Sequence, residues 1–281
     1  MPIAKLPTRV LVLGATGKVA TLLRRYWDLN PPENIELFWA SRRKEPRVTH
    51  VWSPGTPVGP LPQCNAILAL WGTVSGSVDA LANNIALAKE AHRVGEALGA
   101  DRILHASSIA VYAPQDDPIT EDTPPNPRND YGASKHAMEQ AVADLSPKAV
   151  CLRIGNVVGA DSLFASLTRT ETPRLDQFPD GFGPVRGYLR IETLAASVEA
   201  IATSDLETLP CVINVADASP IDMADILRAA GRDFDWKPAP DGATPCMQME
   251  MTRLVGVLGH PLEPVDAHAL VAEWRRLRDR S

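Results

Sequence analysis

The chain has 281 residues, 45% hydrophobic and 22% charged, which is the composition of an ordinary globular protein with a large core. Its formal net charge of -6 argues against a surface that follows nucleic-acid phosphates. The histidines and cysteines show no metal-ligand spacing, and no apolar run approaches the length of a membrane span. We therefore expect a cytoplasmic protein with no metal, nucleic-acid or membrane partner.

Short apolar runs alternate with helical stretches in the first half of the chain. Strands are expected at residues 10–13, 35–40, 49–52, 66–70, 102–106 and 149–154, and helices at 18–27, 81–98 and 131–145. Strand-helix alternation of this kind predicts an α/β fold, a Rossmann-type doubly wound parallel sheet with right-handed crossovers.

The alternation becomes irregular after Asn156, where helices are expected at 194–203, 223–231 and 267–278. We therefore predict two parts. Residues 1–155 form the Rossmann domain, and residues 156–281 form mainly a small C-terminal lobe, with some segments returning to the Rossmann core.

A glycine turn follows the first strand directly and opens the first helix. It has the spacing G-x-x-G-x-x-A, which allows a tight turn, close approach to a pyrophosphate and close packing of the helix. The helix N-terminus then offers unpaired N–H groups to the anion. The residues expected to contact a dinucleotide here are Gly14, Ala15, Thr16, Gly17, Lys18 and Val19.

The end of the second strand predicts which dinucleotide binds. Ser41 and Arg42 stand there, with no carboxylate before Glu45. An acidic residue would bind the ribose hydroxyls of NAD, whereas arginine accommodates the 2′-phosphate of NADP, so the pattern favours NADP(H) over NAD(H). Leu70 and Trp71, at the end of the fourth strand, are placed to flank the cofactor, although packing is the plainer interpretation of Trp71.

Three residues have the chemistry of a carbonyl reduction site. Tyr131 and Lys135 are four positions apart at the start of a helix and so share one face. A nearby ammonium stabilises a tyrosinate and lowers its pKa, which makes Tyr131 the expected acid/base and Lys135 its electrostatic helper. Ser108, at the end of the fifth strand, is expected to hold the substrate oxygen, although Ser107 beside it has the same chemistry.

With these motifs the chain resembles an extended short-chain dehydrogenase/reductase of the NAD-dependent epimerase/dehydratase group. The segments that carry the resemblance are Gly14 to Ala20, Asn84-Ile85, Ser107 to Tyr112, Tyr131 to Lys135, Leu152 to Gly159 and Arg186 to Leu194. The resemblance implies that Asn84 and Ile154 lie at the cofactor and that Asn156 and Arg186 face the substrate. It also implies a homodimer through the helices around 81–98 and 131–145.

The departures from the group's pattern narrow the reaction. Ile109-Ala110 follows Ser108, where dehydratases of the group have an acid/base pair, so dehydration is disfavoured. Only 30 positions separate Asn156 from Arg186, which is short for the substrate lobe of a sugar-nucleotide enzyme.

We therefore expect an NADP(H)-dependent oxidoreductase that transfers a hydride to or from a carbonyl or secondary alcohol, sugar-like or a small aldehyde or ketone. Residues 1–155 would bind NADP and residues 156–281 the substrate. Two alternatives stay open. One is a sugar-nucleotide epimerase with tightly bound NAD, which Arg186 favours. The other is a non-catalytic NADP-sensing protein.

Overall fold

The computed structural model describes residues 6–115 and 117–278. Its centre is a seven-stranded sheet in the order β3-β2-β1-β4-β5-β6-β10, and every neighbouring pair is parallel. The strands are β1 (Thr8–Leu13), β2 (Ile35–Ser41), β3 (His50–Val51), β4 (Ala66–Ala69), β5 (Arg102–Ser108), β6 (Lys148–Ile154) and β10 (Val212–Val215). The predicted Rossmann-type sheet is confirmed.

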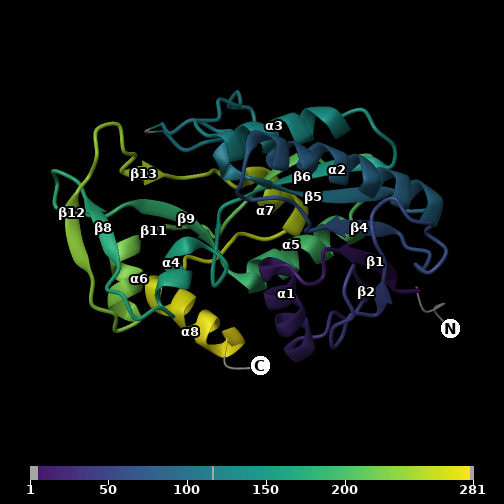
Figure 1. Cartoon of the computed structure of the whole chain (residues 1–281), viewed down its shortest axis with the longest axis horizontal. Helices are drawn as coiled ribbons and strands as arrows, with labels where there is room; N and C mark the ends of the chain where they lie inside the picture. Colours follow the sequence, from purple (N-terminus) through teal and green to yellow (C-terminus); the bar gives the residue numbers. More distant parts are fainter. Residues whose placement is uncertain (1–5, 116, 279–281) are drawn as a thin grey trace.

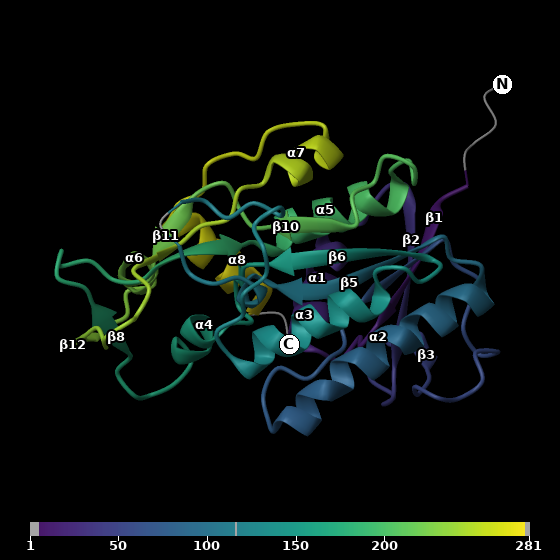
Figure 2. The ribbon, with the colours of Figure 1, turned by 90° about the horizontal axis from the view of Figure 1, so that it is seen from above.

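Helices cover both faces of this sheet (Figure 2). On one face lie α2 (Val78–Leu98) and α3 (Asp130–Val142), packed against each other. On the other lie α1 (Lys18–Leu29), α5 (Ile191–Thr203) and α7 (Thr252–Leu258). The second half of the chain thus supplies β10, α5 and α7 to the larger body.

The side-chain alternation of β1 shows why both faces need a cover. Val10 and Val12 enter the apolar core shared with α1 and α5, whereas Leu11 and Leu13 enter the core beneath α2. All four side chains are fully buried. A strand buried on both faces reads as a continuous apolar run, which is how this segment appears in the sequence.

The strand order reverses between β1 and β4, because β1 is followed by β2 on one side while β4 continues the sheet on the other. In open parallel sheets, a crevice opens at the carboxyl ends of the strands at such a reversal, and ligands bind there. The glycine turn after β1 and the segment after β4 both lie at this edge.

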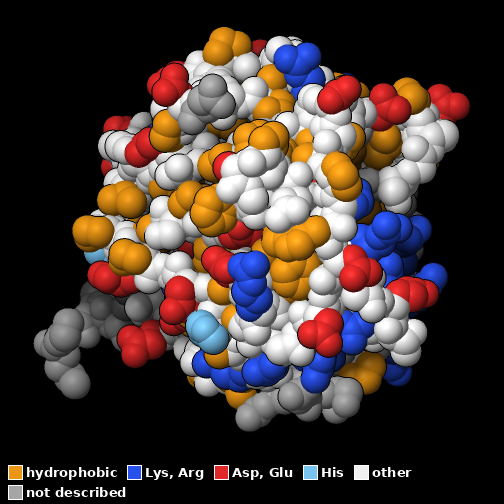
Figure 3. Space-filling view, turned by 90° about the vertical axis from the view of Figure 1, so that its left-hand side faces the viewer, with side chains coloured by type: hydrophobic (Ala, Val, Ile, Leu, Met, Phe, Trp, Pro, Cys, Tyr) orange, Lys and Arg blue, Asp and Glu red, His pale blue; other side chains and the backbone are white. Residues whose placement is uncertain are grey.

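The remaining elements form a smaller body, called here the C-terminal lobe, at the left of Figure 1. Its elements are β7 (Asn156–Val157), α4 (Ser162–Ser166), β8 (Arg174–Gln177), β9 (Val185–Leu189), β11 (Pro220–Asp222), α6 (Met223–Ala229), β12 (Asp235–Pro238), β13 (Cys246–Met247) and α8 (Ala267–Arg278). A separate apolar core holds it together. Its outer end carries hydrophobic side chains interspersed with charged ones (Figure 3).

These short strands form pairs that link distant segments. β7 pairs with β9, which also pairs with β11 and β13, and β8 pairs with β12. Within residues 6–115 and 117–278, no helix combines the length and apolar character needed to cross a bilayer.

Candidate active site

A cavity opens at the strand-order reversal, between the ends of β1, β2 and β4. Its lining includes seven of the residues expected at the dinucleotide: Gly14, Thr16, Gly17, Ser41, Arg42, Leu70 and Trp71. Trp52, Pro54, Gly72, Thr73, Asn83 and Leu87 line it as well. The cavity therefore brings the glycine turn and the predicted cofactor-selecting residues together.

The glycine turn has the shape that a pyrophosphate site needs. Gly14 has a φ of 86°, and a Cβ there would lie 2.8–2.9 Å from Trp71 atoms, so no other residue fits. Gly17 is the N-cap of α1 and no side chain caps this end, so its first N–H groups are available to an anion. Ala15 is fully buried, while Lys18 and Val19 form the first turn of α1.

The residues predicted to select the cofactor, Ser41 and Arg42, lie on the cavity wall formed by the end of β2. The Ser41 hydroxyl lies 3.4 Å from that of Thr16 and accepts a hydrogen bond from the Arg43 N–H at 3.2 Å. Arg42 is exposed at the cavity. The donor set fits a dinucleotide, with backbone N–H groups and an arginine for phosphates.

The three expected catalytic residues come together beside this cavity. Ser108 ends β5 and Tyr131 begins α3, close enough for hydrogen bonding between their hydroxyls. Lys135 is 3% exposed and donates a 2.7 Å hydrogen bond from Nζ to the Ala106 carbonyl. Its Nζ lies 5.9 Å from the centre of the Tyr131 ring. The structure thus places the residues predicted as acid/base, ammonium and orienting hydroxyl in one cluster.

Burial controls the protonation of this cluster. Burial raises the pKa of Tyr131, and this effect outweighs the hydrogen bond with Ser108, which lowers the pKa. Burial lowers the pKa of Lys135 to about 8. The expected lowering of the Tyr131 pKa by Lys135 is not what the structure has, because the ammonium is directed at the Ala106 carbonyl. The phenol is therefore neutral, which is its proton-donating form.

The cluster and the cavity meet at Gly72. A Cβ there would lie 3.4 Å from Lys135 Nζ and 2.9 Å from the Asn84 side-chain oxygen. Asn84 is 2% exposed and hydrogen-bonds both the N–H and the carbonyl of Thr73, at 2.8 and 3.0 Å, and the Ser134 hydroxyl at 3.1 Å. Asn84 thus fixes the loop after β4 against the catalytic helix, and its predicted cofactor contact stays a prediction.

The expected substrate side begins where β6 ends. Ile154 pairs with Ser108 across the sheet, and Asn156 follows two residues later in β7. Asn156 lies opposite Tyr188 of β9 and 3.5 Å from the Asp161 carboxylate. Burial raises the pKa of Asp161 to about 6.

Arg186 occupies a different setting from the one expected of a diphosphate ligand. Its guanidinium donates to the carbonyls of Val185, Thr244 and Pro245 at 2.8, 3.0 and 3.3 Å. These bonds join β9 to the segment before β13. A role at the substrate remains a prediction, and it requires Arg186 to exchange at least one of these carbonyls for the ligand.

Sequence reasoning did not single out several residues of the site. Gly72 and Thr73 carry a weak signal, because they directly follow a strand that ends at the expected ligand edge. Asp161 and Tyr188 carry none, since the pairing of β7 with β9 brings them together.

The comparisons with known proteins agree with this geometry. The model of the NAD dependent epimerase/dehydratase family matches residues 66–173. Over this segment the chain is similar to that family. The matched segment contains Ser108, Tyr131 and Lys135, which confirms the resemblance expected from the sequence.

Proteins similar to part of this chain include a UDP-glucose 4-epimerase of Azospirillum brasilense. The two are 44% identical over 80 residues, which is 27% of this chain and 22% of that enzyme. A putative UDP-arabinose 4-epimerase of Arabidopsis thaliana is 38% identical over 65 residues, 21% of this chain and 15% of that protein. The chain thus aligns with about a fifth or less of these curated relatives' length.

Solved structures show the fold over nearly the whole chain. UDP-glucuronic acid 4-epimerase from Bacillus cereus, in complex with UDP-glucuronic acid and NAD, superposes with a TM-score of 0.77 at 16% identity. The match covers 96% of this chain and 99% of that one. RMD from Pseudomonas aeruginosa, complexed with NADPH, gives 0.75 at 18% identity, covering 98% and 99%.

Proposed function

We propose that this protein is a sugar-nucleotide epimerase that uses a bound nicotinamide dinucleotide. The observation that carries the proposal is the Ser108–Tyr131–Lys135 cluster, which lies against the dinucleotide cavity at Gly72. The relatives that match in sequence are 4-epimerases of UDP-sugars, which supports the epimerase over the NADP(H) oxidoreductase favoured by the sequence alone.

The dinucleotide would be held by the glycine turn, Ser41 and Arg42, and would supply a carbon centre that accepts and returns a hydride. The chain's own residues handle the proton. The Ser108 hydroxyl accepts from the Ala110 N–H at 3.1 Å, which leaves its own hydrogen to donate to a substrate oxygen. Once Tyr131 has lost its own proton, Lys135 would stabilise the phenolate, which would take the proton of a sugar hydroxyl as the hydride leaves. The phenol formed in that step would give the proton back to the intermediate when the hydride returns.

A direct test is the interconversion of UDP-glucose and UDP-galactose, or of the UDP-arabinose pair, followed by proton NMR without added reductant. Wild-type protein is expected to equilibrate one pair. Tyr131→Phe is expected to slow the interconversion by roughly 10²- to 10⁴-fold, because it removes the acid/base while leaving the cavity intact. Cofactor binding should persist in that variant. Full turnover by Tyr131→Phe would refute the assignment of the acid/base.

A second candidate is an NADP(H)-dependent carbonyl reductase. Arg42 at the cavity and the engagement of Arg186 by three carbonyls favour it. Net oxidation of NADPH with a sugar-like or small carbonyl substrate, together with no epimerisation of any nucleotide sugar, would select this reaction. Tight NADPH binding with neither activity would select the sensing protein instead.

The homodimer implied by the family resemblance also remains a proposal. The helices that would form it, α2 and α3, lie side by side on one face of the sheet (Figure 2). Light scattering after size-exclusion chromatography would decide, since a dimer would have twice the 30.4 kDa mass of the chain.

A further inference from the structure

A buried carboxylate lies one helical turn beyond Lys135. Glu139 belongs to α3 and is 7% exposed, because its side chain is buried between this helix and the sheet. Glu139 follows Lys135 by four positions, so the two side chains share the face that α3 turns toward β5. The proposed proton transfers do not use this group, and a buried carboxylate requires a charged or hydrogen-bonding partner.

Every contact of Glu139 leads to a strand of the site. One oxygen accepts from the Ser107 hydroxyl at 2.5 Å, directly beside Ser108. The other accepts from Arg153 Nη2 at 2.7 Å, and the Arg153 Nε–H lies 3.1 and 3.2 Å from the two oxygens. Ser107 and Arg153 are each 4% exposed, so water does not weaken these bonds.

Together with two neighbours, Glu139 fixes the position of α3 along β5. At the start of the helix a Cβ on Gly132 would collide with the Ala110 carbonyl, so the helix approaches closely there. Lys135 bonds the Ala106 carbonyl, and Glu139 bonds Ser107. The contacts at Ala106 and Ser107 immediately precede Ser108, so they set how Ser108 meets Tyr131.

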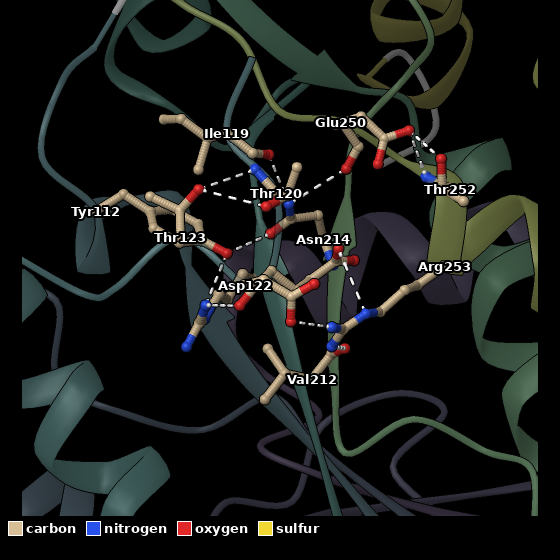
Figure 4. Close-up of polar contacts among 12 residues, drawn as sticks. Tyr112, Ile119, Thr120, Asp122, Thr123, Val212, Asn214, Glu250, Thr252 and Arg253 are labelled. Carbon is tan, nitrogen blue, oxygen red and sulfur yellow. Dashed lines mark hydrogen bonds and ion pairs between the residues drawn. The ribbon is translucent and has the colours of Figure 1, made fainter. Parts of the chain in front are cut away.

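The far side of Arg153 is also held. Its Nη1 donates to the Tyr112 hydroxyl at 2.7 Å, which in turn donates to the Asn214 side chain at 2.9 Å. Figure 4 shows Asn214 at the centre of this network, with Arg253 and Asp122 paired beyond it. Because Arg153 is anchored on both sides, Glu139 has a partner in a fixed position.

We propose that Glu139 is a positioning residue of the active site, which locks Ser107 next to Ser108 and supplies the negative charge that keeps Lys135 an ammonium. This inference rests on the proposed function, because it assigns Lys135 a role as a cation beside Tyr131.

The other groups around Lys135 leave Glu139 as the effective charge. Burial lowers the pKa of Lys135 to about 8, while Cys151 and Glu139 act in the opposite direction. Burial raises the pKa of the Cys151 thiol far above its ordinary range, so Cys151 is neutral when Lys135 titrates. On β5, burial lowers the pKa of His105 to about 3, and it also lowers that of His92 on α2, so both imidazoles are neutral there.

The test is a pH titration of Lys135 in protein labelled with ¹³C-lysine. The signal of its Cε carbon is assigned by its loss in Lys135→Arg. Glu139→Gln keeps the size and removes the charge, so the Lys135 midpoint is expected to fall by about one pH unit. Ser107→Ala removes a contact but no charge and should leave the midpoint in place. Glu96→Gln, on the exposed side of α2, is the matched surface control.

A second readout addresses the position of Ser108. For UDP-sugar interconversion, Ser107→Ala is expected to lower kcat at least tenfold with little change in KM, because substrate still binds but its oxygen is misaligned. Glu139→Asp, which keeps the charge, should restore the Lys135 midpoint but not kcat.

Glu139→Gln leaves the buried Arg153 guanidinium without its carboxylate, which destabilises the fold. Glu139→Gln combined with Arg153→Met removes both charges and is therefore the second variant. A folded variant with an unchanged Lys135 midpoint overturns the proposal. Failure of both variants to fold also overturns it, in favour of a structural role. A shifted midpoint in a protein that interconverts no nucleotide sugar would instead refute the proposed reaction while leaving the effect of Glu139 on Lys135 intact.

Discussion

Replacement of Asp161 by asparagine is expected to stabilise the protein at alkaline pH and to have little effect at pH 4. The Asp161 carboxylate accepts a hydrogen bond from the Phe164 N–H at 2.9 Å as the N-cap of α4, and asparagine is an equally good cap. Burial raises the Asp161 pKa to about 6, despite bonds from Phe164, Tyr188, Leu163 and Asn156 that lower it.

The sign follows from proton linkage. A carboxyl whose folded pKa lies above its unfolded value binds a proton more tightly when folded. Its contribution to stability is therefore present below pH 4 and is lost as pH rises through about 6. The difference between about 6 and the ordinary value of 3.8, at about 1.4 kcal/mol per pH unit, corresponds to roughly 3 kcal/mol. Asparagine resembles the protonated carboxyl and does not ionise, so the variant keeps this stability at high pH.

The assay is urea unfolding of wild-type and Asp161→Asn protein at intervals from pH 4 to pH 8. The variant should match the wild type at pH 4 and exceed it by up to about 3 kcal/mol at pH 8. Asp144→Asn, at an exposed carboxylate, is the control. A stability difference that does not change with pH, or a variant that is less stable at pH 8, would refute the reasoning.

Three further predictions concern binding and stability. Arg42→Ala should weaken NADP⁺ binding by about 10- to 100-fold and NAD⁺ binding far less, because only the predicted contact to the 2′-phosphate is lost. Calorimetry would measure both affinities, with Arg43→Ala as the control. Glu273→Ala should cost about 2 kcal/mol of unfolding free energy, because Glu273 caps α5 by accepting from the Ile191 and Glu192 N–H groups at 2.8 and 2.9 Å; equal urea midpoints would contradict this. Asn214→Ala should lower the free energy of unfolding by about 3 kcal/mol, because the Tyr112 hydroxyl and the Ile119 and Glu250 carbonyls lose their hydrogen bonds to the Asn214 side chain. A Tm within about 1 °C of the wild-type value would contradict this prediction.

The sheet could be predicted because its signals are local. A strand buried on both faces must be apolar throughout, as β1 is, and a helix between parallel strands must be amphipathic, as α1 is. The strands of the C-terminal lobe could not be predicted, because β7, β11 and β13 have two or three residues each and exist through their pairing with β9. Such short segments carry no readable period.

The same distinction separates the site residues. Tyr131 and Lys135 are marked by their spacing on one helix, and Gly14 and Gly17 by their spacing in one turn, so the sequence could indicate them as candidates. Arg42 could also be predicted to line the cavity, because it directly follows the end of a strand at the expected ligand edge. What the spacing could not predict was the protonation state of Tyr131, because that depends on how deeply α3 is buried.

Arg186 shows where a residue type ceases to specify a role. An arginine that follows an irregular segment has five donors and can serve a diphosphate or backbone carbonyls equally well. Three carbonyls take up its donors here, and two of them come from residues 58 and 59 positions further along the chain. Burial also lowers the pKa of Arg186, so an anionic partner would stabilise its charged form. A sugar diphosphate would be such a partner, so its binding should make Arg186 exchange carbonyls for phosphate oxygens. Arg186→Gln should therefore raise the KM for a UDP-sugar more than it lowers kcat, and an unchanged KM would assign the residue to the lobe's structure alone.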